Sequence, residues 1–293
     1  MKKYLYYPGC SLKGTGKAYE ESLIPVFKTL DAELHEIDDW NCCGATAYMS
    51  VDELKAFALA ARNLAIAEKE GGSDLVAPCA ACYLVLSKAQ QYMREYPSER
   101  HEVSEALKGV GLTYSDTIKV RHPLDVLIND IGLKEISSKV KKSLKGLKIA
   151  PYYGCQIVRP YATFDDQYNP TTMDDLIKAC GAEVVYYPLK TRCCGGSLTG
   201  TIPEVGVRLA YILLREARKR GADMLVTACP LCQFNLDGYQ DQMKRRYEEM
   251  SMPILYFTQI LGLAFGIPAK ELGFRRSIIS ANSALDMRGI VHV

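Results

Sequence analysis

The sequence predicts an α/β protein made of two tandem Rossmann-like halves, which are related by internal duplication and built on mainly parallel sheets. Apolar, strand-like runs alternate with helix-length amphipathic segments along the chain, a pattern typical of parallel sheets with right-handed crossovers. Five cysteines also occur twice, in the same order and at nearly the same spacing. A chain of 293 residues has room for two such domains.

The two cysteine sets define the repeat. Each set contains a single cysteine, an adjacent pair followed by glycine, and a C-x-x-C motif, with gaps of 31 and 35 residues in the first half and 37 and 34 in the second. The first set is Cys10, Cys42, Cys43, Cys79 and Cys82, and the second is Cys155, Cys193, Cys194, Cys229 and Cys232. A duplication explains this match better than chance does.

Each half begins with an apolar, tyrosine-rich run that we expect to form a strand. Residues 4–10 of the first half match residues 149–155 of the second, and both runs end in Gly-Cys. Shorter apolar runs at residues 74–77 and 223–226 predict strands that lead into the C-x-x-C motifs. The β-branched and aromatic residues 184–187 predict a buried strand.

Helices are expected between these strands. Ser50 and Glu53 have the spacing of a capping box, and Pro203 suits the first turn of the matching helix in the second half. The residues expected to face the core are Leu54, Phe57, Ala58, Ala61, Leu64 and Ala65 in the first helix and Val205, Leu209, Ile212 and Leu213 in the second.

The two halves are expected to join in a Lys- and Ser-rich stretch at residues 135–146. The predicted domains are therefore an N-terminal domain of residues 1–140 and a C-terminal domain of residues 141–293. Residues 274–293 have no counterpart in the first half and form an appended tail.

The charge balance and the apolar pattern argue against several partners and locations. Thirty-six basic and 34 acidic residues leave a net charge of +2, which argues against nucleic acid or a membrane surface recognised by charge. No apolar leader follows Met1, and the apolar stretch at residues 254–267 is too short to span a bilayer. We therefore expect a cytoplasmic protein without membrane insertion, where cysteine clusters more often serve metal or redox chemistry than disulfides.

The cysteines are expected to converge in space, because each part of a set follows directly on a predicted strand. Loops at the carboxyl ends of parallel strands share one crevice, where ligands bind. Glycines beside the cysteines, such as Gly9 and Gly154, allow the backbone to approach a bulky inorganic cluster closely. Backbone N–H groups in these loops can donate to sulfide.

The common uses of cysteine fit these sets poorly. A structural zinc ion needs four ligands and a cubane [4Fe–4S] cluster four thiolates, so either would leave a fifth cysteine over. A thioredoxin-like dithiol would use the C-x-x-C motif alone, and disulfides are rare in the cytoplasm. The spacing favours an unusual cluster with more than four thiolate contacts, which the residues alone do not name.

The motif C-x31-C-C-G-x34-C-x2-C and its repeat resemble the twofold CCG-domain pattern of the B subunit of heterodisulfide reductase, from Tyr4 to about Gly266. The resemblance implies two non-cubane [4Fe–4S] clusters, one on each set of five cysteines. It also implies reductive cleavage of a disulfide that lies between the clusters. Each sulfur would be captured by an iron atom, and two electrons and two protons would release two thiols.

The electrons are expected from other chains, because no ferredoxin-type C-x2-C-x2-C-x3-C-P run occurs. The resemblance implies two partners: a ferredoxin-type iron–sulfur protein similar to the C subunit of that family, and a flavin-containing donor similar to its A subunit. The substrate would be a small-molecule or protein-bound disulfide. Two alternatives remain open: an electron relay in a larger redox complex without its own disulfide substrate, and a heterodisulfide reductase-like subunit of sulfur oxidation.

Further residues lie close to the cysteines in the sequence. Tyr7 and Tyr153 precede the first cysteine of each set and are candidates for lining the crevice. Lys190 and Arg192 precede the second cysteine pair, where they would either meet an anionic substrate or balance the charge of a cluster. Cys180 stands outside both sets and is expected to pack as a small apolar residue at a helix end.

Overall fold

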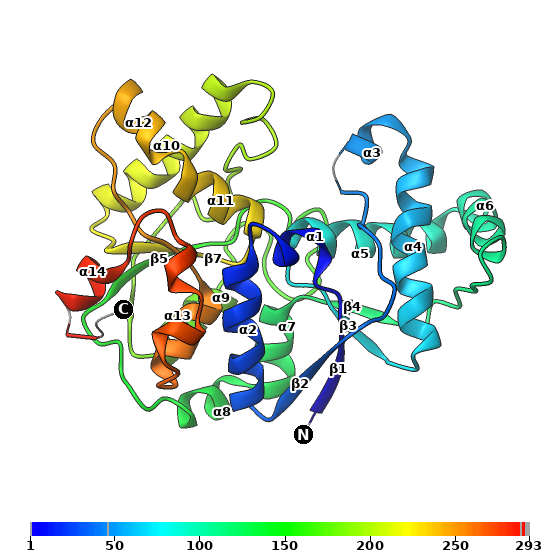
Figure 1. Ribbon diagram of the computed structural model, residues 1–293, viewed down its shortest axis with the longest axis horizontal. Coiled ribbons are helices and arrows are strands. Elements are labelled where there is room, and N and C mark those ends of the chain that lie inside the picture. Colours follow the sequence, from blue (N-terminus) through cyan, green and yellow to red (C-terminus); the bar gives the residue numbers. More distant parts are fainter. Residues whose placement is uncertain (1, 46, 288, 291–293) are drawn as a thin grey trace.

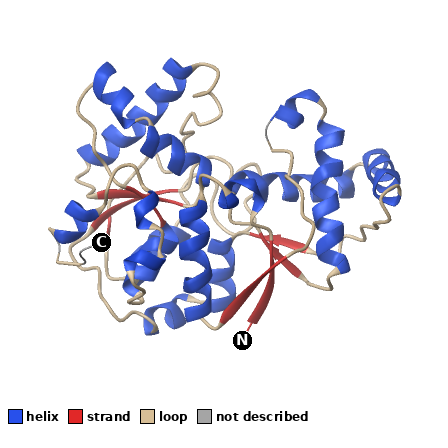
Figure 2. Ribbon diagram, in the orientation of Figure 1, coloured by secondary structure: helices blue, strands red, loops and turns tan. Residues whose placement is uncertain are grey.

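The computed structural model describes residues 2–45, 47–287 and 289–290. Two four-stranded parallel sheets form its centre, with the strand orders β2-β1-β3-β4 and β6-β5-β7-β8 (Figures 1 and 2). The strands are β1 Lys2–Tyr6, β2 Ala32–Glu36, β3 Asp74–Val76 and β4 Lys119–Arg121, then β5 Lys148–Tyr152, β6 Glu183–Val184, β7 Met224–Thr227 and β8 Ile254–Tyr256. The same topology occurs twice, which confirms the predicted fold class and the duplication.

Helices connect the strands and cover the sheets. The helices of the first half are α1 Gly9–Lys13, α2 Lys17–Thr29, α3 Ala47–Val51, α4 Glu53–Lys69, α5 Ala80–Glu95, α6 Pro97–Lys108, α7 Pro123–Asp125, the π-helix η1 Val126–Ile131 and α8 Leu133–Ser138. Those of the second half are α9 Thr172–Ala179, α10 Pro203–Lys219, α11 Pro230–Gly238, α12 Gln240–Arg246, α13 Phe257–Ala264, the 3₁₀ helices η2 Ala269–Glu271 and η3 Phe274–Arg276, and α14 Asn282–Asp286. The matching helices α4 and α10 each contain 17 residues.

The two halves pack against each other through helices, and the apolar core continues from one half into the other. Helix α2 of the first half lies against α13 of the second, and α9 of the second half lies against α7 of the first (Figure 1). The hydroxyls of Ser22 and Thr258 form a buried hydrogen bond of 2.6 Å between α2 and α13. Each half therefore contributes two helices to these contacts.

The tail is held by contacts with both halves. Arg276 forms an ion pair of 2.6 Å with Glu21 on α2. Asp237 accepts hydrogen bonds from the backbone N–H groups of Ile278 and Ile279.

The predicted boundary between residues 140 and 141 falls in the loop after α8 and stays a prediction. No helix in the described part of the chain combines the length and the apolar character needed to cross a membrane.

Two local predictions were wrong. The side chain that caps α4 belongs to Asp52, which accepts from the Lys55 N–H at 3.1 Å, because Ser50 already lies inside α3. The strand predicted at residues 184–187 shrinks to the two-residue β6, and Tyr186 is 72% exposed. Strand β6 lies at the edge of its sheet, where only β5 holds it.

The prediction for α10 was partly wrong: Leu213 is buried as predicted, but other residues of the predicted face are not. Val205 and Ile212 are 39% and 40% exposed, while Val207, Ala210 and Leu214 face the core. Gly206 explains this orientation, because it packs directly on Gly195: a Cβ added at Gly195 would lie 2.9 Å from the Cα of Gly206. The close approach of the two glycines rotates the small residues of α10 toward the loop that carries the second cysteine pair.

Candidate functional site

The cysteines of both sets lie near the carboxyl ends of the strands, on loops and at the first turns of helices. Cys10 is in the first turn of α1, and Cys79 and Cys229 are the N-cap residues of α5 and α11. The adjacent pairs do not follow directly on strands as predicted. Cys42 and Cys193 come six and nine residues after the ends of β2 and β6, so loops carry both pairs back to the other cysteines.

The structure brings the five cysteines of the first set together. The Sγ atoms of Cys43 and Cys82 are 3.3 Å apart. The thiol of Cys42 lies against that of Cys43, and the thiol of Cys79 lies against that of Cys82. Cys10 interacts electrostatically with Cys42 at the outer side of the group.

The second set forms a similar group. The thiol of Cys193 contacts those of Cys155 and Cys194, and the thiol of Cys232 contacts those of Cys194 and Cys229. Backbone N–H groups also point at this set, since Gly195 and Gly196 donate to the sulfurs of Cys193 and Cys194 at 3.3 Å each. The assignment of the ten residues as ligands stays a prediction.

Both sets have an exposed side and a buried side. Cys10, Cys42 and Cys193 are exposed, and Cys155 is half-buried. The second cysteine of each adjacent pair and both cysteines of each C-x-x-C motif are buried: Cys43, Cys79, Cys82, Cys194, Cys229 and Cys232. Each group is therefore anchored in the core and reaches the surface at one edge.

Contacts between the thiols lower the pKa of some cysteines and raise the pKa of others. Side-chain contacts with Cys42 and Cys82 lower the pKa of Cys43 to about 4, while the contact with Cys43 raises the pKa of Cys42. In the second set, hydrogen bonds from Cys155 and Cys194 lower the pKa of Cys193, and donation to Cys193 raises the pKa of Cys194 to about 12. A metal cation could replace the shared protons, because the thiolate is the form that binds metal.

In each group of cysteines, a glycine packs closely against a buried sulfur atom. Gly9 has φ +64°, and a Cβ added there would lie 2.9 Å from the Sγ of Cys82. Gly154 has φ +74°, and its added Cβ would lie 3.3 Å from the Sγ of Cys232. In both halves the backbone therefore approaches the buried sulfur of the C-x-x-C motif as closely as only glycine permits.

A tyrosine beside each set holds the loop of the adjacent pair. The hydroxyl of Tyr7 donates to the carbonyl of Asn41, and the hydroxyl of Tyr152 donates to the carbonyl of Arg192. The Tyr7 hydroxyl interacts electrostatically with four cysteines of the first set, so this tyrosine lies beside the set, and its role in lining a crevice stays a prediction. Tyr153 instead reaches Asp174 on α9, so Tyr152 takes the place that was predicted for Tyr153.

Of the two basic residues before the second pair, Lys190 has a different environment from the one predicted, and the role of Arg192 stays a prediction. Lys190 is buried, pairs with Asp174 at 3.2 Å, and lies over the ring of Tyr153. These contacts occupy Lys190 within the fold, and Arg192 is exposed. The cation that acts on Cys193 is Arg159, from the loop after Cys155, which no sequence signal singled out.

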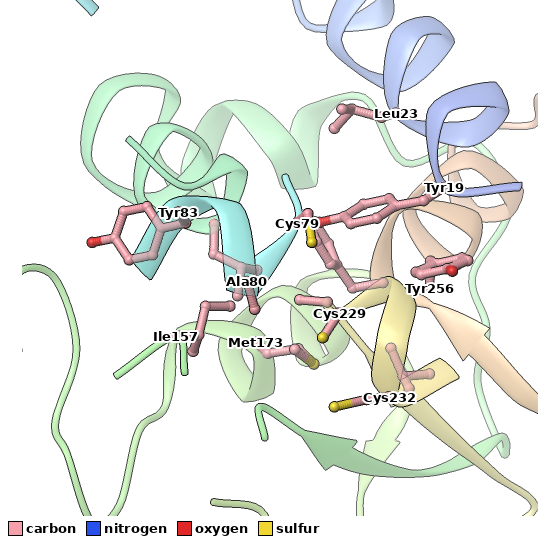
Figure 3. Packing of buried hydrophobic residues seen from close by; sticks show 14 of the residues in the cluster. Tyr19, Leu23, Cys79, Ala80, Tyr83, Ile157, Met173, Cys229, Cys232 and Tyr256 are labelled. Carbon is pink, nitrogen blue, oxygen red and sulfur yellow. The ribbon is translucent and has the colours of Figure 1, made fainter. Parts of the chain in front are cut away.

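The two groups of cysteines meet at the boundary between the halves. The hydrogen bond from Cys232 lowers the pKa of Cys229, and so does the backbone of Ala80, which belongs to the other half. Figure 3 shows the ring of Tyr19 extending from α2 toward Cys79, with Tyr256 and Cys229 close by. His122 is fully buried beside this boundary, where its Nε2 lies 3.1 Å from the carbonyl oxygen of Pro78.

Cys180 stands outside both sets. Cys180 is fully buried at the end of α9, as predicted, and burial raises its pKa to about 12. Among the described residues, no group of three or more His, Cys, Asp or Glu side chains is arranged around the position of a single metal ion.

The chain is similar to known proteins over nearly its whole length. The model of the cysteine-rich CCG domain matches residues 4–87 and 149–237, which include all ten repeated cysteines. The chain is 34% identical to the 8-methylmenaquinol:fumarate reductase membrane anchor subunit of Wolinella succinogenes over 96% of this chain and 98% of that protein. It is 33% identical to a protein of Archaeoglobus profundus that is named as similar to the B subunit of heterodisulfide reductase, over 93% of this chain and 94% of that protein.

A methanogen protein and a solved structure are also similar. Identity to the B subunit of the ferredoxin/F420H2-dependent CoB-CoM heterodisulfide reductase of Methanosarcina acetivorans is 29%, over 95% of this chain and 94% of that protein. The crystal structure of a hypothetical protein from Helicobacter pylori matches with a TM-score of 0.76 and 15% identity. That match covers 95% of this chain and 52% of the other, and it supports the fold alone.

Proposed function

Because this chain belongs to the cysteine-rich CCG-domain family, with two copies of the domain, we propose that it reductively cleaves a disulfide between two non-cubane [4Fe–4S] clusters. The chain is an iron–sulfur redox subunit whose relatives include heterodisulfide reductase B subunits. The cluster type, the number of clusters and the disulfide substrate are the proposal.

The residues fit such clusters. Each set offers five thiols, so more sulfur is available than a single zinc ion or a cubane needs. Gly9 and Gly154 leave no side chain between the backbone and the buried sulfurs, and two N–H groups already point at the second set. We propose that Cys10, Cys42, Cys43, Cys79 and Cys82 hold one cluster and that Cys155, Cys193, Cys194, Cys229 and Cys232 hold the other.

The juxtaposition of two complete sets carries the proposal. Reduction of R–S–S–R′ to RSH and R′SH consumes two electrons and two protons. Two bound clusters would supply the electrons, one to each sulfur atom. The role of the chain is to position the two groups at one boundary, where Ala80 of the first half reaches Cys229 of the second, and to leave Cys10, Cys42 and Cys193 exposed.

A count of iron and acid-labile sulfide tests the cluster assignment. Two four-iron clusters require about eight of each per chain. A count near four, or stoichiometric zinc, would contradict the two-cluster assignment. Substituting Cys43 or Cys194 with serine should remove roughly half of the iron, since each substitution disables one set.

A second candidate is an electron relay without a disulfide substrate. The 34% identity to a fumarate reductase subunit over nearly its whole length favours this alternative, because that relative is named for a complex that reduces fumarate. An anaerobic assay with several disulfides separates the two functions. A disulfide-reducing protein releases two thiols for each pair of electrons consumed, whereas a relay loses its electrons only to a protein partner.

The proposal requires partner chains. Electrons would come from a ferredoxin-type iron–sulfur subunit, and before it from a flavin-containing subunit, because this sequence has no ferredoxin motif of its own. We place the protein in the cytoplasm, as a peripheral subunit where its complex contacts a membrane. Co-purification of the tagged chain from its own organism, followed by identification of flavin and iron in the complex, tests this composition.

A further inference from the structure

Two buried tyrosine hydroxyls have no hydrogen-bond partner. They belong to Tyr19 on α2 and Tyr256 at the end of β8, which are 0% and 1% exposed. Within the described residues, these are the buried side-chain nitrogen or oxygen atoms left without a partner. Other buried tyrosines are satisfied; for example, the Tyr187 hydroxyl donates to the carbonyl of Leu213 at 3.0 Å.

The two rings form a pair across the boundary between the halves. They stack with centroids 4.5 Å apart and an interplanar angle of 11°. Tyr19 comes from the first half and Tyr256 from the second, so each half contributes one hydroxyl. Besides burial, and besides Tyr256 in the case of Tyr19, the groups that act most strongly on both hydroxyls are Cys229 and Cys79. These are one buried cysteine from each set, and Figure 3 shows both near the two rings.

This arrangement is costly in the absence of an acceptor. A hydroxyl buried without a hydrogen bond destabilises a protein, and here two such groups lie together. Burial also raises the pKa of both hydroxyls, so both keep their protons and can donate. Figure 3 shows Cys79 and Cys229 near the two rings, so sulfur at these positions is a possible acceptor.

We propose that Tyr19 and Tyr256 are a shared pair of hydrogen-bond donors to the sulfur atoms at Cys79 and Cys229 when both sets carry iron–sulfur clusters. The inference rests on the proposed function, because it needs clusters at these thiolates. Because the two rings stack at the boundary between the halves, one pair of hydroxyls would serve both cluster sites. It also stabilises the more negative, reduced state of each cluster, since hydrogen bonds to cluster sulfurs raise reduction potentials.

Redox titration of the loaded protein tests the pair directly. In Tyr19→Phe and Tyr256→Phe, the ring and its stacking remain and only the hydroxyl is lost. We expect at least one cluster potential, followed by EPR, to move to a more negative value in each variant. Tyr187→Phe is the matched control: it also removes a buried hydroxyl, but one bonded to Leu213, and it should leave both potentials at their wild-type values.

Unfolding of the cluster-free chain gives a second readout that does not depend on cluster loading. Without clusters, Tyr19→Phe and Tyr256→Phe remove an unpaired hydroxyl, so their unfolding temperatures should equal or exceed the wild-type value. Tyr187→Phe should lower it, because it breaks a hydrogen bond.

Unchanged potentials in both loaded variants would overturn the inference and would indicate an ordered water as the partner. Loss of stability in both cluster-free variants, to the extent seen in Tyr187→Phe, would overturn it as well. A wild-type protein that binds no iron would overturn the inference together with the proposed function. Normal iron content with unmoved potentials would overturn the inference alone.

Discussion

The hydroxyl of Tyr152 donates a hydrogen bond of 2.6 Å to the carbonyl of Arg192, the residue directly before the second cysteine pair. In the first half, Tyr7 makes the same contact with Asn41 at 2.7 Å. Each tyrosine ends or follows the first strand of its half, so a rigid sheet position holds a long loop in place. In both halves, a hydrogen bond from a tyrosine hydroxyl therefore holds the loop that brings the cysteine pair to the rest of its set.

The two contacts differ in what remains after the hydroxyl is lost. The carbonyl of Asn41 also accepts a hydrogen bond of 3.1 Å from the side-chain amide of Asn63. For the carbonyl of Arg192, the donor that the structure records is the Tyr152 hydroxyl. Tyr152→Phe should therefore cost about 1–2 kcal/mol in free energy of unfolding, and Tyr7→Phe less, about 0.5 kcal/mol. Urea titration of the cluster-free chain measures both. A larger loss in Tyr7→Phe would contradict this account of the loops.

The close approach of Gly9 to Cys82 predicts that substituting Gly9 causes a selective loss of iron. Gly9→Ala places a methyl group 2.9 Å from the Sγ of Cys82 and forces a side chain into φ +64°, so we expect the first set to lose its cluster. Iron content should then fall from about eight atoms per chain to about four. Gly71→Ala is the control, since Gly71 has φ +79° and no atom within 4 Å of an added Cβ. Full iron content in Gly9→Ala would show that the close approach does not matter.

Buried His122 predicts a dependence of stability on pH. Burial lowers its pKa to about 3, against the opposing effects of the backbone at Pro78 and of Asp125, and the rings of Tyr83 and Phe164 pack around it. The unfolded chain therefore binds this proton below about pH 6.5 while the folded chain does not. Stability should fall with decreasing pH between about 6.5 and 3, by up to roughly 1.4 kcal/mol per pH unit from this residue.

His122→Gln should flatten that dependence, because glutamine takes up no proton in this range. The free energy of unfolding of the cluster-free chain, measured by denaturant titration at several pH values, checks the slope. The same substitution at His101, which is exposed on α6, controls for the loss of a histidine as such. An identical slope in wild type and His122→Gln would show that His122 is not the group responsible.

Much of the site could be predicted from the sequence, because covalent order and strand geometry determine it. Parallel strands bring their carboxyl ends to one edge of a sheet, so cysteines after β1, β3, β5 and β7 had to converge. The repeat also locates Tyr7 and Tyr152 at equivalent positions. Choosing Tyr153 instead failed because neighbouring strand residues point to opposite faces, and Tyr153 reaches Asp174 on the other side.

Other features depend on packing that no local pattern reveals. The rotation of α10 follows from the contact of Gly206 with Gly195, and Val205 looks as apolar in the sequence as Val207 does. Tyr19 and Tyr256 belong to no motif and meet only because α2 packs on α13. Arg159 acts on Cys193 from the segment between β5 and α9, whereas in the first half the helices α1 and α2 follow β1.

The most direct test of the central claim is a single-turnover reaction of the fully reduced, cluster-loaded chain with disulfides under anaerobic conditions. We predict that the wild-type chain releases two thiols for each disulfide consumed. Cys43→Ser and Cys194→Ser, each with one intact set, should release none above background, because both sulfur atoms need a cluster. No thiol release from the wild-type chain with any disulfide, or full release from either variant, would contradict the account.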